Sequence, residues 1–106
     1  MWKVCISEEE RYQNVEKIFP LQQRDVGKII DALRKCDTVE KVIIFGSSVT
    51  SACNPWSDID IYLKLKEEVN IRVPRVEVPT DVWTNFDVDN RLMAEIDEKG
   101  VVVYER

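Results

Sequence analysis

Two aspartates on one short segment follow a glycine–serine step in this chain. Gly46-Ser47 ends one apolar run, and Asp58 and Asp60 open the next one. A Gly-Ser turn can offer backbone N–H groups and a hydroxyl to phosphate oxygens. An Asp-x-Asp on a strand holds both carboxylates on one side, about 6.6 Å apart along the chain. Together these residues are typical of a site that binds a nucleotide and magnesium.

Magnesium is the cation that such a donor set favours. Mg²⁺ prefers carboxylate and phosphate oxygens, and two such ions about 3.5–4 Å apart can hold the attacking and leaving oxygens of a phosphoryl transfer in line. The chain contains no histidine, which excludes histidine-ligated zinc and a Ser-His catalytic triad. Carboxylates are therefore the expected metal ligands.

Three apolar runs predict the strands that position these residues. Residues 41–45 form a β-branched and aromatic run that stops at Gly46, as in a buried strand. Residues 59–65 alternate, so the Ile and Leu side chains should face the core while Asp58, Asp60 and Tyr62 lie on the open face. Residues 76–84 predict a third strand at a sheet edge, because it contains Pro79. On that strand Val76, Val78 and Val82 should point inward, and Glu77, Asp81 and Trp83 outward.

Helical patterns surround these strands. Val26, Ile29, Ile30 and Leu33 recur at helical spacing and predict an amphipathic helix over 21–36. A second helix is expected over 88–98, followed by a short strand over 101–104, and shorter helices over 7–18 and 47–53. This order of elements predicts an α+β sandwich, a small mixed sheet with helices packed on one face.

Composition narrows the classes of partner. The 106 residues include 15 Lys and Arg against 20 Asp and Glu, a net charge of −5, which argues against long nucleic-acid partners. No apolar stretch approaches the ~20 residues of a membrane span. Cys5, Cys36 and Cys53 form no CxxC pair, as expected of reduced thiols. We expect a soluble cytoplasmic protein with one small domain over 1–106, its core over 26–105 and an N-terminal extension over 1–20.

The spacing of the motifs resembles a known family. Gly46-Ser47, ten residues and then Asp58-x-Asp60 resemble the signature of minimal nucleotidyltransferases in the DNA-polymerase-β-like superfamily. Asp81-Val82-Trp83 resembles the strand that carries the family's third carboxylate, and residues 96–105 resemble its closing helix and strand. The resemblance covers residues 26–105.

The resemblance implies an activity and a set of roles. It implies Mg²⁺-dependent transfer of AMP from ATP to an acceptor hydroxyl, with Asp58, Asp60 and Asp81 as catalytic residues and ligands of two Mg²⁺ ions. Gly46, Ser47 and Ser48 would contact the phosphates of ATP. In similar minimal proteins the acceptor is a tyrosine of a HEPN-type toxin, which the nucleotidyltransferase neutralises as an antitoxin.

Several alternatives remain open from the sequence. Residues 48–54 contain none of the arginines that many members carry after the Gly-Ser step, so a module that neutralises a basic partner by binding alone is the second hypothesis. A self-contained aminoglycoside-type enzyme would require a homodimer. Glu77 and Asp87 compete with Asp81 as the third carboxylate. Trp56 either packs over its loop or stacks on a nucleobase.

Overall fold

The computed structural model describes residues 6–50 and 57–106. Its helices and strands, in chain order, are α1 (Gln23–Leu33), β1 (Val39–Phe45), β2 (Ile59–Leu65), β3 (Thr80–Thr84), α2 (Asn90–Lys99) and β4 (Val101–Glu105). Four 3₁₀ turns complete the set: η1 (Glu8–Glu10), η2 (Val15–Lys17), η3 (Pro20–Gln22) and η4 (Gly46–Val49). The predicted α+β class with a mixed sheet is confirmed, as are the two long helices and the closing strand. Cys5, Cys53 and Trp56 lie outside the described residues.

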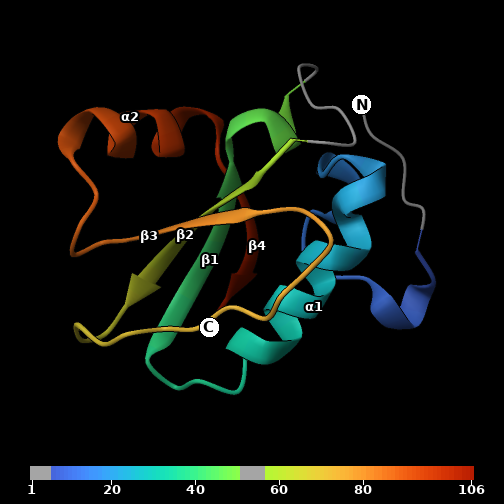
Figure 1. Ribbon diagram of the computed structural model, residues 1–106, viewed down its shortest axis with the longest axis horizontal. Helices are drawn as coiled ribbons and strands as arrows, with labels where there is room; N and C mark the ends of the chain where they lie inside the picture. The colour runs from blue at the N-terminus through green and yellow to red at the C-terminus, as the bar shows by residue number, and fades with distance from the viewer. Residues whose placement is uncertain (1–5, 51–56) are drawn as a thin grey trace.

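The four strands form one sheet in the order β3-β2-β1-β4. β1 pairs antiparallel with β2 and with β4, whereas β2 and β3 run parallel. The end of β1, the beginning of β2 and the beginning of β3 therefore meet at one end of the sheet (Figure 1). As predicted, β3 is an edge strand.

One face of the sheet is covered by α1. The stripe Val26, Ile29, Ile30 and Leu33 is fully buried against Val42 and Ile44 of β1 and the alternating Ile and Leu residues of β2. Burying such a stripe contributes roughly 1.5–3 kcal/mol for each side chain. This packing fixes which side chains of β2 point away from α1.

The opposite face carries α2, which corrects the expectation that the helices share one face. Ile96 of α2 is buried against Ile43, Phe45 and Tyr62, which alternate with the residues that face α1. α1 and α2 consequently lie on opposite sides of the sheet (Figure 1). The face expected to be open is thus partly covered by α2, and Tyr62 is buried rather than exposed.

Two expected elements are shorter than the sequence pattern suggested. Residues 7–18 form two 3₁₀ turns instead of a helix, because Asn14 has a positive φ of 60° that interrupts helical geometry. The strand expected over 76–84 begins only at Thr80, after Pro79, which has no N–H to donate. Val76 and Val78 still pack against the α1 side of the core.

No helix in the described part of the chain is long and apolar enough to cross a membrane.

Candidate active site

The Gly-Ser step and the Asp-x-Asp motif meet at the end of the sheet. Phe45, the last residue of β1, is the register partner of Asp60 in β2. Gly46 follows with a positive φ of 74°, a backbone conformation that glycine adopts at no steric cost. A Cβ placed on Gly46 would overlap the carboxylate of Asp60. The backbone of the turn therefore lies directly against the second aspartate of the motif.

The parallel pairing of β2 and β3 brings a third carboxylate to the same place. Asp60 and Asp81 are register partners, so their side chains project from the same face of neighbouring strands about 4.8 Å apart. The rival carboxylates are placed differently. Glu77 lies before β3, and Asp87 accepts a hydrogen bond from the N–H of Thr84 in the turn after it, at 2.8 Å.

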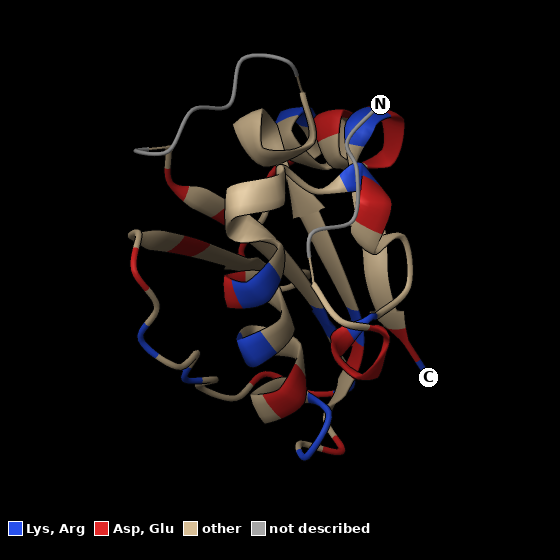
Figure 2. Ribbon diagram, turned by 90° about the vertical axis from the view of Figure 1, so that its right-hand side faces the viewer, with Lys and Arg blue, Asp and Glu red and all other residues tan. Residues whose placement is uncertain are grey.

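The electrostatics of Asp60 reflect this crowding. Partial burial, followed by the negative charges of Asp81, Asp58 and Glu95 in that order, raises the pKa of Asp60 to about 6. Three carboxylates, one on β3, one on α2 and one directly before β2, thus act on Asp60. Figure 2 shows red acidic segments on the neighbouring ribbons of β2 and β3. Such a cluster disfavours ionisation unless a cation is present.

Glu95 is the member of this group that the sequence analysis missed. It is exposed on α2, directly before the buried anchor Ile96. No motif marks it, because its proximity to Asp60 depends on α2 packing over this face of the sheet. The only available signal was the acidic residue beside an apolar anchor on a helix whose face was unknown.

Comparison with known proteins agrees with this geometry. A family model described as "Polymerase beta, Nucleotidyltransferase" matches residues 27–106. The chain belongs to the polymerase beta nucleotidyltransferase family. No match was found among curated proteins. The family model spans every described element of the candidate site, from the Gly-Ser step to α2.

The donor set of this nucleotidyltransferase domain fits magnesium only in part. All of the candidate ligands are carboxylate oxygens, which hard cations prefer. Within residues 6–50 and 57–106, however, no three acidic or Cys side chains stand close enough to hold a cation. Mg²⁺ is commonly held by one or two carboxylates together with substrate phosphates and water. The residues therefore fit an ion that arrives with a nucleotide better than an ion held by the protein alone.

Ser48 corrects the expectation for the phosphate-binding group. Its side chain is fully buried, and its hydroxyl donates a hydrogen bond to Oε1 of Gln22. Gln22 in turn donates from Nε2 to the carbonyl of Ser57 at 2.8 Å. The Ser48 hydroxyl thus links the turn to Gln22 on the side away from the candidate site. Ser47 is half-buried on η4 and lies between Gly46 and Ser48.

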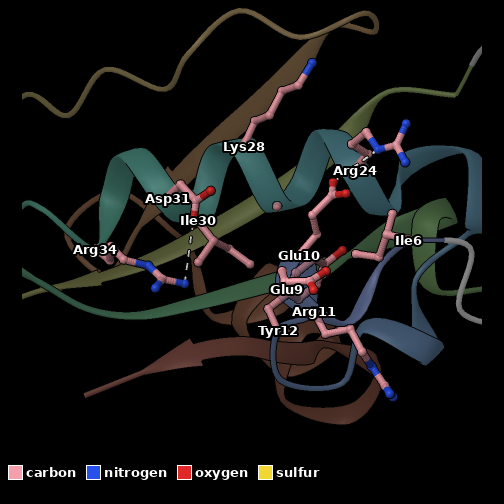
Figure 3. A pocket seen from close by; sticks show the side chains of 11 residues that line it. Ile6, Glu9, Glu10, Arg11, Tyr12, Arg24, Lys28, Ile30, Asp31 and Arg34 are labelled. Carbon is pink, nitrogen blue, oxygen red and sulfur yellow. Dashed lines mark hydrogen bonds and ion pairs between the residues drawn. The ribbon is translucent and has the colours of Figure 1, made fainter.

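A cavity of about 240 Å³ lies elsewhere, between the N-terminal segment and α1 (Figure 3). Its rim carries two ion pairs, Arg24 with Glu10 and Arg34 with Asp31. Figure 3 shows Lys28 pointing away from the other labelled side chains. Because α1 covers the face of the sheet opposite to α2, this cavity is separate from the carboxylate cluster.

Proposed function

We propose that this nucleotidyltransferase domain transfers AMP from ATP to a hydroxyl of an acceptor protein in a Mg²⁺-dependent reaction. The observation that carries the proposal is the registration of Asp60 with Phe45 on one side and with Asp81 on the other. These two pairings bring the Gly46-Ser47 turn and the carboxylates of Asp60 and Asp81 to one end of the sheet.

Each residue has a defined task in the proposed reaction. The backbone at Gly46 and the hydroxyl of Ser47 bind the β- and γ-phosphates. Asp58 and Asp60 would hold Mg²⁺ together with the phosphates, and Asp81 would contribute to the same site. The ion would supply positive charge that offsets the charge of the phosphates and of the leaving pyrophosphate.

The bond changes are those of an in-line displacement. The acceptor oxygen forms a bond to the α-phosphorus, while the bond from that phosphorus to the bridging oxygen of pyrophosphate breaks. Asp81 lies on β3 and accepts the hydroxyl proton.

The finer form of the proposal concerns the acceptor. We propose a tyrosine of a HEPN-type toxin partner, with the domain acting as antitoxin in the cytoplasm. The position of Asp81 supports a protein acceptor, because this carboxylate is exposed on the edge strand β3, where a protein surface can reach it. A homodimer is the alternative in which a second copy encloses a small acceptor.

A binding experiment tests the nucleotide site first. Calorimetry with ATP and Mg²⁺ together should show binding to the wild type and a loss of at least about tenfold in affinity for the Asp58→Asn, Asp60→Asn double variant. Mg²⁺ without ATP should bind much more weakly. Asp37→Asn is the matched control, because Asp37 is 99% exposed and precedes the opposite end of β1. Equal affinity of both variants would refute the proposed site.

A transfer experiment tests the reaction. The protein, ATP, Mg²⁺ and a co-expressed HEPN-type partner are incubated, and intact-mass spectrometry should show the partner heavier by AMP units. The Asp58→Asn, Asp60→Asn protein should leave the partner unmodified. Unmodified partner with the intact protein would contradict the proposal.

One observation favours a second function. The stretch 46–54 carries no basic residue to neutralise a triphosphate, as would suit a module that neutralises a basic partner by binding alone. The discriminating measurement is neutralisation by Asp60→Asn protein. Neutralisation without modification would support binding alone, and loss of both would support catalysis.

A further inference from the structure

Two aromatic side chains are exposed on β3 and in the turn that follows it. Trp83 on β3 is 38% exposed, and Phe86 in the turn after β3 is 45% exposed. Trp83 is the register partner of Tyr62, just as Asp81 is the partner of Asp60. Because side chains two residues apart share a face, Trp83 and Asp81 project to the same side of the sheet, about 6.7 Å apart along the strand.

The strand order separates the two sides of the candidate site. β1 lies on one side of β2 and delivers Gly46, and β3 lies on the other side and carries Asp81 and Trp83. In phosphoryl transfer the attacking and leaving oxygens stand in line on opposite sides of phosphorus. If pyrophosphate departs along the Gly46 turn, as the proposed function requires, the acceptor approaches from β3.

The charge around the aromatic pair indicates the chemistry of that acceptor. Residues 80–90 contain three aspartates and no Lys or Arg, and Asp81, Asp87 and Asp89 are all exposed. Asp87 and Asp89 each accept a backbone N–H at 2.8 Å through Oδ1. An indole face beside carboxylates is a good position for a Lys or Arg side chain. A polynucleotide would be repelled.

We propose that Trp83 and Phe86 form the docking surface for the acceptor, a basic protein segment that carries the accepting hydroxyl. A side chain that lies over Trp83 would place the hydroxyl, one or two residues away in the segment, beside Asp81. The direction from which the acceptor approaches rests on the proposed function. The docking itself can be measured without turnover.

A labelled peptide tests the docking surface. The probe is a synthetic peptide with one tyrosine flanked by lysine and leucine residues, and its counterpart has glutamate in place of lysine. Fluorescence anisotropy should show binding of the basic peptide only, weakening as salt is added. Trp83→Ala should weaken binding about thirtyfold, as for a hot-spot tryptophan, and Trp83→Phe should lose much less. Leu21→Ala is the matched control, since Leu21 is 67% exposed and lies on η3.

The outcomes separate this proposal from the proposed function. Mg²⁺-ATP affinity should be unchanged in Trp83→Ala, so a loss there would assign Trp83 to the nucleotide and overturn the docking surface. Failure of the wild type to bind the basic peptide, or equal binding by Trp83→Ala, would also overturn it. Docking through Trp83 without transfer of AMP would uphold the surface and contradict only the transferase function.

Discussion

At the scale of single residues, Gly46 is the position at which the site tolerates least change. Its φ of 74° lies in the left-handed region, and the space that a Cβ would occupy is filled by the Asp60 carboxylate. Both conditions require glycine, the first for the backbone and the second for the neighbouring side chain.

Gly46→Ala should therefore damage both stability and nucleotide binding. We expect a loss of about 1–3 kcal/mol in the free energy of unfolding and at least a tenfold loss in Mg²⁺-ATP affinity, roughly 1.4 kcal/mol. Urea unfolding and calorimetry measure the two effects.

The matched control is Gly27→Ala in α1. A Cβ there would meet Tyr12 at 3.4 Å, an ordinary packing distance, and alanine is the better helix former by about 1 kcal/mol. Gly27→Ala should be neutral or stabilising and should bind Mg²⁺-ATP normally. Wild-type affinity in Gly46→Ala would refute the argument from close approach.

At the scale of elements, a series of hydrogen bonds connects η4 to the segment before α1. The backbone N–H of Phe19 donates to the carbonyl of Ser48 at 2.9 Å. The hydroxyl of Ser48 donates to Gln22, and Gln22 donates to the carbonyl of Ser57. The segment before α1 thus ties the end of β1 to the entry of β2. This connection fixes the turn relative to Asp58 and Asp60.

Adjacent serines should consequently respond in opposite ways. Ser48→Ala leaves a buried amide oxygen of Gln22 without its donor and should cost about 1–3 kcal/mol of unfolding free energy. Ser47→Ala should change stability by less than about 0.5 kcal/mol but weaken Mg²⁺-ATP binding about tenfold, because a hydrogen bond to a charged phosphate is lost.

Thermal or urea unfolding together with calorimetry distinguishes the two variants. A stable Ser48→Ala protein with reduced Mg²⁺-ATP affinity would indicate that Ser48 contacts the phosphates after all. An unaffected Ser47→Ala protein would leave phosphate binding to the backbone alone.

At the scale of the whole molecule, the sheet is the middle of three layers, and one of its ends is acidic. α1 and α2 cover opposite faces, and α2 closes over only part of its face. The negative charges of carboxylates on β3, on α2 and directly before β2 act on Asp60. The net charge of −5 adds to this field. The molecule therefore concentrates negative charge where the proposed reaction requires cations.

This concentration predicts how stability depends on pH. The pKa of Asp60 rises from 3.8 in the unfolded chain to about 6 in the folded one. Between these values the native state binds more protons, so the contribution of Asp60 to stability is present below about pH 4 and falls as pH rises through 6. The shift would correspond to about 3 kcal/mol, and because Asp60 is partly exposed, solvent screening reduces this to roughly 1 kcal/mol.

Asp60→Asn removes this titration and should flatten the pH profile while stabilising the protein at neutral pH without nucleotide. Urea unfolding of wild type and Asp60→Asn across this pH range is the measurement, with Asp37→Asn as the exposed control. A parallel profile for wild type and Asp60→Asn would show that neither burial nor the neighbouring carboxylates raise the pKa of Asp60. Addition of Mg²⁺-ATP at neutral pH should stabilise the wild type but not Asp60→Asn.

Much of the site and fold followed from local patterns in the sequence. The helical stripe of α1 and the alternation in β2 each reflect the burial of one face, and such periodicity is visible without neighbours. The Gly46-Ser47 step and the Asp58-x-Asp60 pair were recognisable because their geometry is set within a few residues. The edge position of β3 followed from Pro79 in the same way.

Only the tertiary structure decided what depends on residues distant in the chain. The register between β2 and β3 places Asp81 opposite Asp60 and leaves Glu77 and Asp87 outside β3, and no local pattern specifies register between strands separated by a long connection. The packing of α2 against Ile43, Phe45 and Tyr62 brings Glu95 to the cluster. The burial of Ser48 depends on Gln22, 26 residues earlier. The sequence thus determined the chemistry of the groups, and folding determined which of them meet.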